Sequence, residues 1–227
     1  MSGYSPPFAN RLFRWAFRPI FRLIFHLLSD VRISGKENIP RSGAYLIAIN
    51  HISLFEAPLM TAFWPTAPEA AGAVEIWDRP GQSILVRLYG GIQVHRGEFD
   101  RQALEAIIAA LNSGRPLLLA PEGRRSHTPG MQRALPGAAY IIEKTGVPVL
   151  PVGIVGTTDD FFDRAIGGHR PAIEIRIGEP LRLPPIEGKG AARRAALQAN
   201  ADRIMLAIAS LLPPEYRGVY QAPAGPV

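Results

Sequence analysis

Short apolar runs alternate with amphipathic segments along most of this chain. Runs bounded by glycine, proline or other turn residues predict strands. These strands fall at 31–34, 44–49, 70–76, 92–96, 116–120, 147–155 and 172–177. Apolar residues at helical spacing predict helices at 56–64, 80–89, 99–111, 135–144 and 191–212. Strands that alternate with helices in this way indicate an α/β fold.

Two proline-containing stretches qualify this picture. Pro148 and Pro151 remove backbone donors from the segment 147–155, so we expect it to be an edge strand, a strand terminus or an irregular segment. Residues 213–227 begin with two prolines, and we expect them to be unstructured or draped on the surface. The sequence contains no internal repeat and no long linker. We therefore expect an N-terminal segment over 1–30, one domain over 31–212 and a Pro/Gly-rich tail over 213–227.

The segment 10–28 combines arginines with bulky apolar residues at helical spacing. At about 100° per residue, one stripe of roughly 80° holds Arg11, Arg14, Arg18 and Arg22. Its apolar runs are too short to span a bilayer, which needs about 20 mainly apolar residues. We expect an amphipathic helix in the membrane interface, with arginines toward anionic headgroups and aromatic residues in the acyl boundary. Pro19 should bend it or divide it. The alternative is a core helix with a solvated arginine stripe.

Composition narrows the class of protein and of partner. The chain has 227 residues, of which 47% are hydrophobic and 19% charged, enough for one well-packed domain. Its net charge of +6 indicates a negatively charged partner such as lipid headgroups, phosphorylated substrates, an acidic carrier protein or nucleic acid. No nucleic-acid-binding motif accompanies the basic residues, so we expect no nucleic-acid partner. The absence of cysteine excludes disulfides, thiolate nucleophiles and cysteine metal sites.

The first candidate for chemistry is a histidine and a carboxylate five residues apart, just after the apolar run 44–49. His51 lies where open α/β sheets place their ligand crevices, at the carboxyl end of a strand. Glu56 could accept a hydrogen bond from one ring nitrogen of His51 while the other nitrogen removes a proton from a substrate hydroxyl. Ser53-Leu54-Phe55-Glu56 is also a helix capping box, so Glu56 could instead do no more than cap the next helix. The heptapeptide alone leaves both roles open.

Two later strands also deliver polar residues at their carboxyl ends. Arg96 ends the strand over 92–96, and the strand over 116–120 is followed by Glu122, Arg124 and Arg125. Arginine suits a phosphate group because its planar fork makes two charge-assisted hydrogen bonds. The three strand ends together offer a base, its orienting carboxylate and cations for a phosphate.

At this point the sequence resembles the lysophospholipid acyltransferase family, which includes 1-acylglycerol-3-phosphate acyltransferases. Four ordered blocks carry the resemblance, at Asn50–Glu56, Gly91–Arg96, Pro121–Ser126 and Val147–Val152. They resemble the family's N-H-x4-D, G-x-x-F-I-x-R and P-E-G-T-R-S motifs and its apolar, proline-containing fourth block. The resemblance implies one domain with a mixed, largely parallel central sheet flanked by helices, and N-terminal helices that sit on the membrane.

The resemblance also implies a reaction. A fatty acyl group would pass from an acyl-CoA or acyl-carrier-protein thioester directly to a lysolipid hydroxyl, with no acyl-enzyme, no metal and no cofactor. His51 would be the general base and Glu56 its orienter. Arg96 and Arg125 would bind the acceptor's phosphate, while Glu122 with Gly123 would shape the acceptor pocket. We expect a peripheral protein on the cytoplasmic side of the cell membrane.

The sequence departs from the family pattern at three positions. Glu56 replaces the usual aspartate, Val74 stands where a lysine is common, and Arg124 replaces a threonine. The loss of a cation at Val74 and the gain of one at Arg124 change the expected headgroup-binding site more than they change the expected reaction.

Several alternatives remain open at this stage. One is a different acceptor, such as a lyso-ornithine lipid or a glycolipid, and another is a peripheral lipid-binding protein without catalysis. A zinc site is disfavoured because the spacing from His51 to Glu56 does not match H-E-x-x-H. A serine hydrolase is disfavoured because Ser126 does not sit in a G-x-S-x-G elbow.

Overall fold

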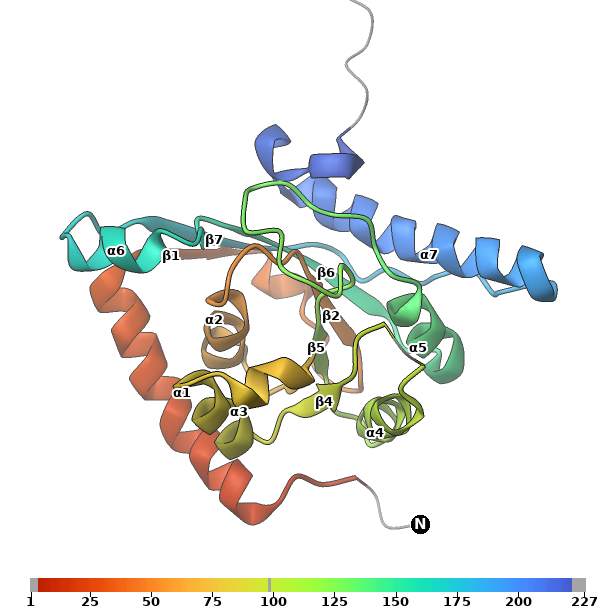
Figure 1. Ribbon diagram of the computed structural model, residues 1–227, viewed down its shortest axis with the longest axis horizontal. Coiled ribbons are helices and arrows are strands. Elements are labelled where there is room, and N and C mark those ends of the chain that lie inside the picture. Colours follow the sequence, from red (N-terminus) through yellow and green to blue (C-terminus); the bar gives the residue numbers. More distant parts are fainter. Residues whose placement is uncertain (1–3, 98, 222–227) are drawn as a thin grey trace, which may run out of the picture.

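A seven-stranded sheet forms the centre of the protein in the computed structural model, which describes residues 4–97 and 99–221 (Figure 1). In chain order the strands are β1 (Asp30–Ser34), β2 (Leu46–Ile49), β3 (Glu69–Ala73), β4 (Ile92–Val94), β5 (Leu117–Leu119), β6 (Val149–Val155) and β7 (Ala172–Ile177). Across the sheet their order is β1-β7-β6-β2-β5-β3-β4. Neighbours within this sheet pair in parallel, apart from the antiparallel pair β6–β7. The expected mixed, largely parallel α/β sheet is confirmed.

Helices cover both faces of the sheet. They are α1 (Phe8–Leu28), α2 (Glu56–Phe63), α3 (Gln82–Tyr89), α4 (Arg101–Asn112), α5 (Gly137–Thr145), α6 (Phe161–Ile166) and α7 (Gly190–Leu211). Leu46 and Ala48 of β2 join one core with α4, α5 and α7. Ile47 and Ile49 point to the opposite face and join a second core with α1, α2 and α6. Burial on both faces explains why β2 is a continuous apolar run rather than an alternating one.

The expectation that 147–155 is an edge, terminal or irregular segment is wrong. β6 is an interior strand with β2 on one side and β7 on the other. The carbonyl oxygen of Pro151 accepts a hydrogen bond from the backbone of Gly178 at 2.9 Å, but the β6–β7 ladder begins only at the Val152–Ile177 pair. The N–H and C=O positions of one strand residue point to the same side, so the missing donor of Pro151 faces β7 beyond the end of that strand rather than β2. The ladder with β2 is therefore intact.

Two smaller expectations are also corrected. The strand expected over 70–76 begins at Glu69 and ends at Ala73, and Val74–Asp78 form the 3-10 helix η2. Residues 213–221 lie on the surface, as one alternative expected, but they are folded rather than unstructured, with 3-10 helices η3 (Pro214–Tyr216) and η4 (Gly218–Tyr220). The phenol of Tyr220 donates to Asp202 of α7 at 2.8 Å. The rest of the expected tail, 222–227, lies outside the described residues.

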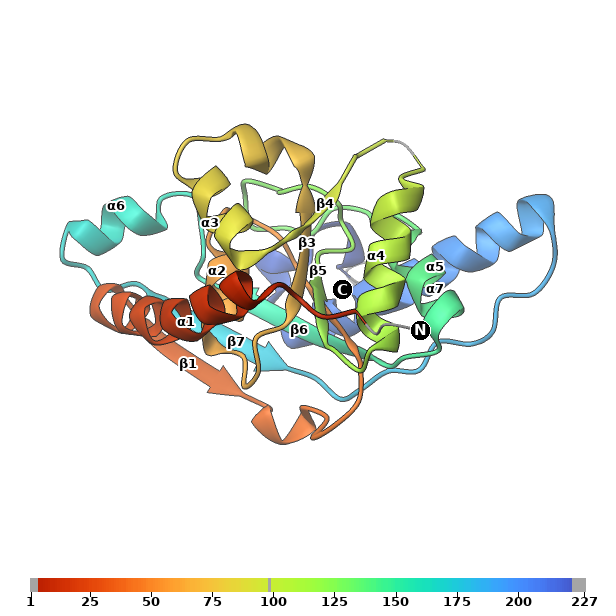
Figure 2. The ribbon, with the colours of Figure 1, turned by 90° about the horizontal axis from the view of Figure 1, so that it is seen from below.

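Three of the four arginines in the stripe of α1 face the protein rather than lipid headgroups or solvent, which corrects the expected direction of the stripe; Arg11 is exposed. Arg18 and Arg22 donate to backbone carbonyls at the carboxyl end of α2, including that of Ala62 at 2.7 Å. Arg14 donates to the carbonyl of Tyr89, the last residue of α3, at 2.8 Å. Helix ends leave such carbonyls without partners in the helix, and a cation there also complements the helix dipole. The arginines therefore hold α1 against α2 and α3 (Figure 2).

A buried ion pair completes this attachment. The guanidinium of Arg14 makes two 2.8 Å hydrogen bonds to the carboxylate of Glu69 on β3, and both side chains are at most 3% exposed. Arg115 donates to the same carboxylate at 2.6 Å, and the phenol of Tyr4 donates to it at 3.0 Å. Burial alone would raise the pKa of Glu69, but hydrogen bonds and charges from Arg14 and Arg115 outweigh it and the pKa is lowered.

The outward face of α1 is apolar. Exposed large side chains on it are Phe8, Leu12, Trp15, Ile20, Leu23, Ile24 and Leu27, with Trp15 75% exposed. Pro19 does not divide the helix, which runs without interruption from Phe8 to Leu28. In the part of the chain that the structure describes, helices of the length and apolarity that a bilayer span requires are absent.

Candidate active site

The candidate catalytic segment, Asn50–Glu56, leaves the sheet at the carboxyl end of β2. The buried side chain of Asn50 donates to the carbonyl of Ile154 on β6 at 2.9 Å and accepts from the amide of Ile154 at 2.7 Å. This two-way contact fixes the point at which the chain turns out of the sheet, and His51 follows directly. The predicted location of His51 at a strand end is confirmed.

His51 and Glu56 are in direct contact. Nδ1 of His51 lies 3.0 Å from Oε2 of Glu56, whose side chain is fully buried while that of His51 is 18% exposed. The glutamate also accepts hydrogen bonds from the backbone amide of Ser53 at 3.0 Å and from the hydroxyl of Thr157 at 2.6 Å. A carboxylate surrounded by donors is best satisfied when ionised, because it then only accepts.

Glu56 makes contacts that bear on both roles left open by the sequence. It is the first residue of α2, whose N-cap is Phe55 rather than Ser53; its carboxylate accepts from the amide of Ser53 three residues back, and the same carboxylate contacts His51. When Nδ1 of His51 donates to Glu56, the ring's lone pair is on Nε2, which is the tautomer that a general base requires.

The loop after β5 supports this segment through Glu122. Its carboxylate accepts a hydrogen bond from the backbone amide of His51 at 2.9 Å and from that of Gln132 at 2.7 Å. Burial raises the pKa of Glu122 to about 7, and the negative charge of Glu56 adds to the increase. The side chain is only 2% exposed, so its effect on an acceptor pocket is indirect: it holds the loop that carries His51.

Gly123 allows this loop to turn. Its φ of 71° is in the left-handed region, and an added Cβ would lie 2.6 Å from Leu135. The backbone conformation therefore favours glycine there, and an added Cβ would also displace the end of the Leu135 side chain.

The candidate phosphate-binding cations lie at the same edge of the sheet. Arg96 follows β4, while Arg124 and Arg125 follow β5, and β2, β4 and β5 run in the same direction. Partial burial lowers the pKa of Arg96, and the positive charges of Arg79 and Arg125 add to this shift. Arg125 is therefore close enough to Arg96 to act on it electrostatically. Arg124 is exposed.

Similarity to known proteins identifies the family of this chain. Residues 30–155, more than half of the chain, match the family model described as Acyltransferase. The chain belongs to the acyltransferase family. The match spans β1 to β6 and includes His51, Glu56, Arg96 and the loop after β5.

Two individual proteins are similar to this acyltransferase. The 1-acyl-sn-glycerol-3-phosphate acyltransferase of Borreliella burgdorferi is 28% identical over 148 residues, which cover 64% of this chain and 59% of that protein. This acyltransferase thus matches about three fifths of its relative's length. The crystal structure of the 1-acyl-sn-glycerophosphate (LPA) acyltransferase PlsC from Thermotoga maritima superimposes with a TM-score of 0.61 at 26% identity, over 86% of this chain and 79% of that chain.

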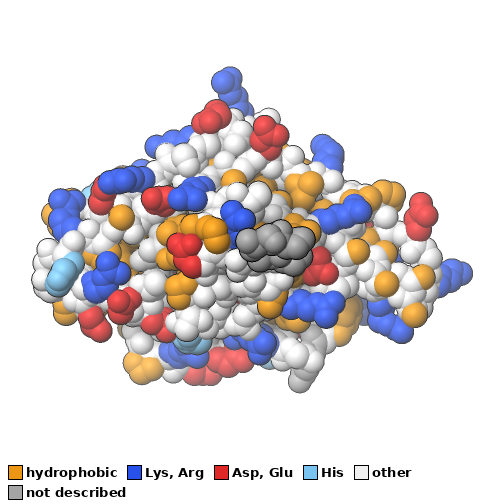
Figure 3. Space-filling view, turned by 90° about the horizontal axis from the view of Figure 1, so that it is seen from above, with side chains coloured by type: hydrophobic (Ala, Val, Ile, Leu, Met, Phe, Trp, Pro, Cys, Tyr) orange, Lys and Arg blue, Asp and Glu red, His pale blue; other side chains and the backbone are white. Residues whose placement is uncertain are grey.

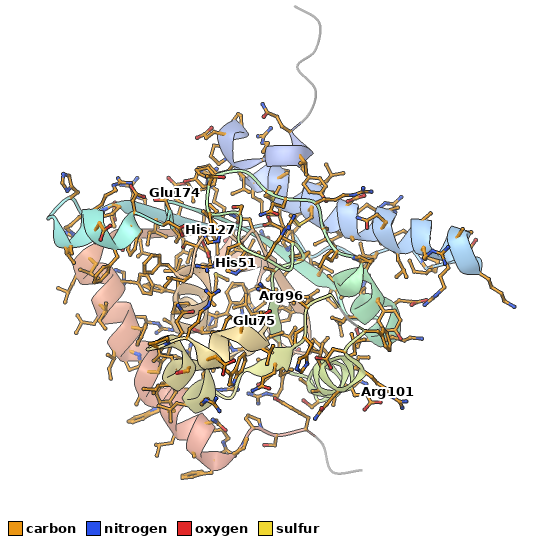
Figure 4. The ribbon with its side chains drawn as sticks, viewed as in Figure 1. His51, Glu75, Arg96, Arg101, His127 and Glu174 are labelled. Carbon is orange, nitrogen blue, oxygen red and sulfur yellow. The ribbon has the colours of Figure 1, made fainter. Side chains whose placement is uncertain are left out.

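Some groups around the site escaped the sequence analysis. Thr157 supplies a hydrogen bond to Glu56 from 101 positions away, and nothing in the local sequence marks it. Glu75, on η2, brings a negative charge to the cation cluster: it favours the charged form of Arg96, and Figure 4 places the two residues together. Only its position just after a strand could have indicated it, by the same reasoning that selected Arg96.

His127 lies beside the candidate catalytic segment, and its Nδ1 is 2.8 Å from Oδ2 of Asp159 (Figure 4). Ser126, which was considered and set aside as a nucleophile, donates its hydroxyl to the carbonyl of Thr128 at 2.6 Å. Over residues 4–97 and 99–221, no group of three or more His, Asp or Glu side chains is arranged to hold a metal ion.

Proposed function

We propose that this acyltransferase moves a fatty acyl group from acyl-CoA or acyl-carrier protein to the hydroxyl of a lysophospholipid such as 1-acylglycerol-3-phosphate. The observation that carries the proposal is the contact between His51 and the buried carboxylate of Glu56 at the edge where the arginines gather. The names of the two similar acyltransferases support a glycerophosphate acceptor.

The reaction follows from the roles of these groups. Nε2 of His51 takes the acceptor's hydroxyl proton as its oxygen attacks the thioester carbonyl carbon, and Glu56 stabilises the imidazolium that forms. The new C–O bond forms, the C–S bond breaks, and the imidazolium returns its proton to the departing thiolate. The products are an ester and a free thiol, without an acyl-enzyme. Arg96 and Arg125 bind the acceptor's phosphate and so place its hydroxyl near His51.

The test is an acyl-transfer assay read by mass spectrometry. Palmitoyl-CoA and palmitoyl-carrier protein are each offered with lysophosphatidic acid, a lyso-ornithine lipid and a lysoglycolipid. We expect a diacyl product with lysophosphatidic acid that His51→Ala abolishes, while the control His169→Ala, an exposed histidine on another loop, retains it. A His51-dependent product with another acceptor would support the alternative headgroups. Lipid binding without turnover for any pair would favour a non-enzymatic lipid-binding protein.

A second part of the proposal is that α1 places the enzyme on a membrane surface, peripherally and on the cytoplasmic side of the cell membrane. The inward arginines leave an almost wholly apolar outer face on α1, the kind of face that enters the acyl boundary of a bilayer. Anionic lipids would be attracted by the net charge of +6. Figure 3 shows lysine and arginine side chains spread over one face among acidic ones rather than gathered in one patch.

The membrane role can be tested separately from catalysis. The double variant Leu12→Glu, Trp15→Glu places two charges on the outer face of α1, and we expect it to lose binding to vesicles of anionic phospholipid. Transfer to a short-chain soluble acceptor should persist, because neither side chain touches the site. If the variant binds vesicles as well as the wild type does, α1 is not the membrane-binding element.

A further inference from the structure

The loop after β5 pairs directly with the catalytic segment. The backbone amide of Ser126 donates to the carbonyl of His51 at 2.9 Å, and the amide of His127 donates to the carbonyl of Ile52 at 2.9 Å. Consecutive residues of one loop therefore bind consecutive residues of the other. Together with Glu122, which accepts from the amide of His51, the loop binds both the amide and the carbonyl of His51.

His127 adopts a backbone conformation that is unfavourable for its side chain. Its φ is 62°, and among the described residues the only other non-glycine with positive φ is Arg170. Such conformations persist where the surrounding structure holds them, and they cluster at functional sites. Here the holding contact is visible: Nδ1 of His127 lies 2.8 Å from Oδ2 of Asp159.

Asp159 belongs to the segment that supports the other half of the catalytic pair. It lies two residues after Thr157, whose hydroxyl donates to Oε1 of Glu56. The contact between His127 and Asp159 therefore connects the loop that holds His51 to the segment that holds Glu56. The path from His51 to His127, Asp159, Thr157 and Glu56 closes on the contact between His51 and Glu56.

We propose that His127 and Asp159 form a positioning pair that keeps His51 and Glu56 in register. Neither residue touches the reacting atoms in this scheme; they act through the two segments that carry the catalytic side chains. The kinetic part of the proposal rests on the proposed function, because it needs an assay of acyl transfer. The structural part does not.

The exposure of the His127 and Asp159 side chains distinguishes a role in positioning the catalytic residues from a role in stabilising the fold. The side chains of His127 and Asp159 are 55% and 47% exposed, and exposed ion pairs contribute little to folding. Misplacement of a catalytic group by about 1 Å, in contrast, can lower a rate by about 100-fold. Loss of this pair should therefore change the rate much more than the melting temperature.

Two substitutions at His127 and one at Asp159 isolate the contact. His127→Gly suits a φ of 62° and removes the donor, whereas His127→Asn also tolerates this φ and keeps a donor on Cγ, where Nδ1 is attached. Asp159→Ala removes the acceptor. Arg101→Ala breaks another exposed ion pair, Arg101–Glu105, on the far side of the molecule and serves as the matched control (Figure 4).

The kinetic outcomes are as follows. We expect kcat to fall about tenfold in His127→Gly and Asp159→Ala, with KM for the acceptor within about twofold of wild type. His127→Asn and Arg101→Ala should keep kcat close to wild type, and the double variant His127→Gly, Asp159→Ala should be no slower than either single variant. A wild-type kcat in His127→Gly overturns the proposal. So does a His127→Asn variant as slow as His127→Gly, or a loss expressed mainly in KM, since both indicate direct contact with substrate.

A second measurement needs no substrate. Hydrogen–deuterium exchange of the amides of Ser126 and His127 reports whether the two loops stay paired. We expect about fivefold faster exchange in His127→Gly and Asp159→Ala and unchanged exchange in His127→Asn. If wild type transfers no acyl group, the proposed function fails and exchange alone decides the structural claim. Unchanged exchange in both donor and acceptor variants overturns it.

Discussion

Replacement of Glu56 by glutamine tests the catalytic pair most directly. The carboxylate accepts from Nδ1 of His51, the amide of Ser53 and the hydroxyl of Thr157, so donors surround both of its oxygens. Glutamine keeps the shape but replaces one acceptor by a donor. If its amide nitrogen faces His51, the imidazole must move its proton to Nε2, where it can no longer act as a base. In either orientation the negative charge beside the imidazolium is lost.

The size of the effect follows from the distance. A unit charge pair at 3.0 Å interacts with about 5.5 kcal/mol at an effective dielectric constant of about 20. Loss of that amount from the stabilisation of the transition state would slow kcat by about 10⁴-fold. Replacement of aspartate by asparagine in a serine-protease triad has an effect of about the same size.

The assay is steady-state acyl transfer with a saturating thioester donor. We expect kcat of Glu56→Gln to fall by about 10³- to 10⁴-fold, with Glu105→Gln, an exposed glutamate, unchanged. Glu56→Asp withdraws the carboxylate by one carbon–carbon bond, about 1.5 Å, which takes the contact with His51 beyond hydrogen-bond distance. We expect about a 100-fold loss for that variant. A Glu56→Gln enzyme within tenfold of wild type would refute the role of Glu56 in stabilising the imidazolium.

Three further predictions follow from the charges in the structure. The pKa of Glu122 is about 7 in the folded protein and about 4.5 in the unfolded chain, so the folded state binds more protons between these pH values. The free energy of unfolding should therefore fall by about 3 kcal/mol as pH rises through this range. Urea titrations at several pH values should show this slope in wild type and not in Glu122→Gln. Glu69→Gln leaves the buried guanidinium of Arg14 without this charge partner. The free energy of unfolding should drop by about 3–5 kcal/mol in the same urea titrations. A loss below about 1 kcal/mol would contradict the burial of this pair. Arg96→Ala should raise KM for a phosphate-bearing acceptor by about 10- to 100-fold, and Glu75→Gln should lower it, whereas an uncharged glycolipid acceptor should show neither change.

Much of the fold was predictable from the sequence because its signals are local. Apolar runs between turn residues located the strands to within a few residues, and helical spacing located α4, α5 and α7. The wrong expectation for β6 shows the limit of this reasoning. A proline is harmful inside a sheet only if its missing donor faces a partner, and whether it does depends on where β7 ends.

The arginines of α1 show the same limit. Their spacing along a helix is a property of the sequence, and the stripe was located correctly. Its direction depends on groups far along the chain: Glu69 is 55 positions from Arg14, and the carbonyls of α2 are about 40 positions from Arg22. Burial of an arginine is tolerated only where the fold places carboxylates or carbonyls within hydrogen-bond distance of its guanidinium. The sequence pattern alone could not distinguish a stripe toward lipid headgroups from a stripe toward the protein.

The sequence by itself determined the pair His51 and Glu56, because they are five positions apart and a strand end followed by a helix start brings such neighbours together. It also determined that arginines follow two other strands. Only the tertiary structure decided which distant groups support the pair. Thr157 is 101 positions from Glu56 and Glu122 is 71 from His51, and each reaches the site because β2 lies between β5 and β6. Strand order is set by packing of the whole sheet, so contacts made across it are invisible in any local stretch of the chain.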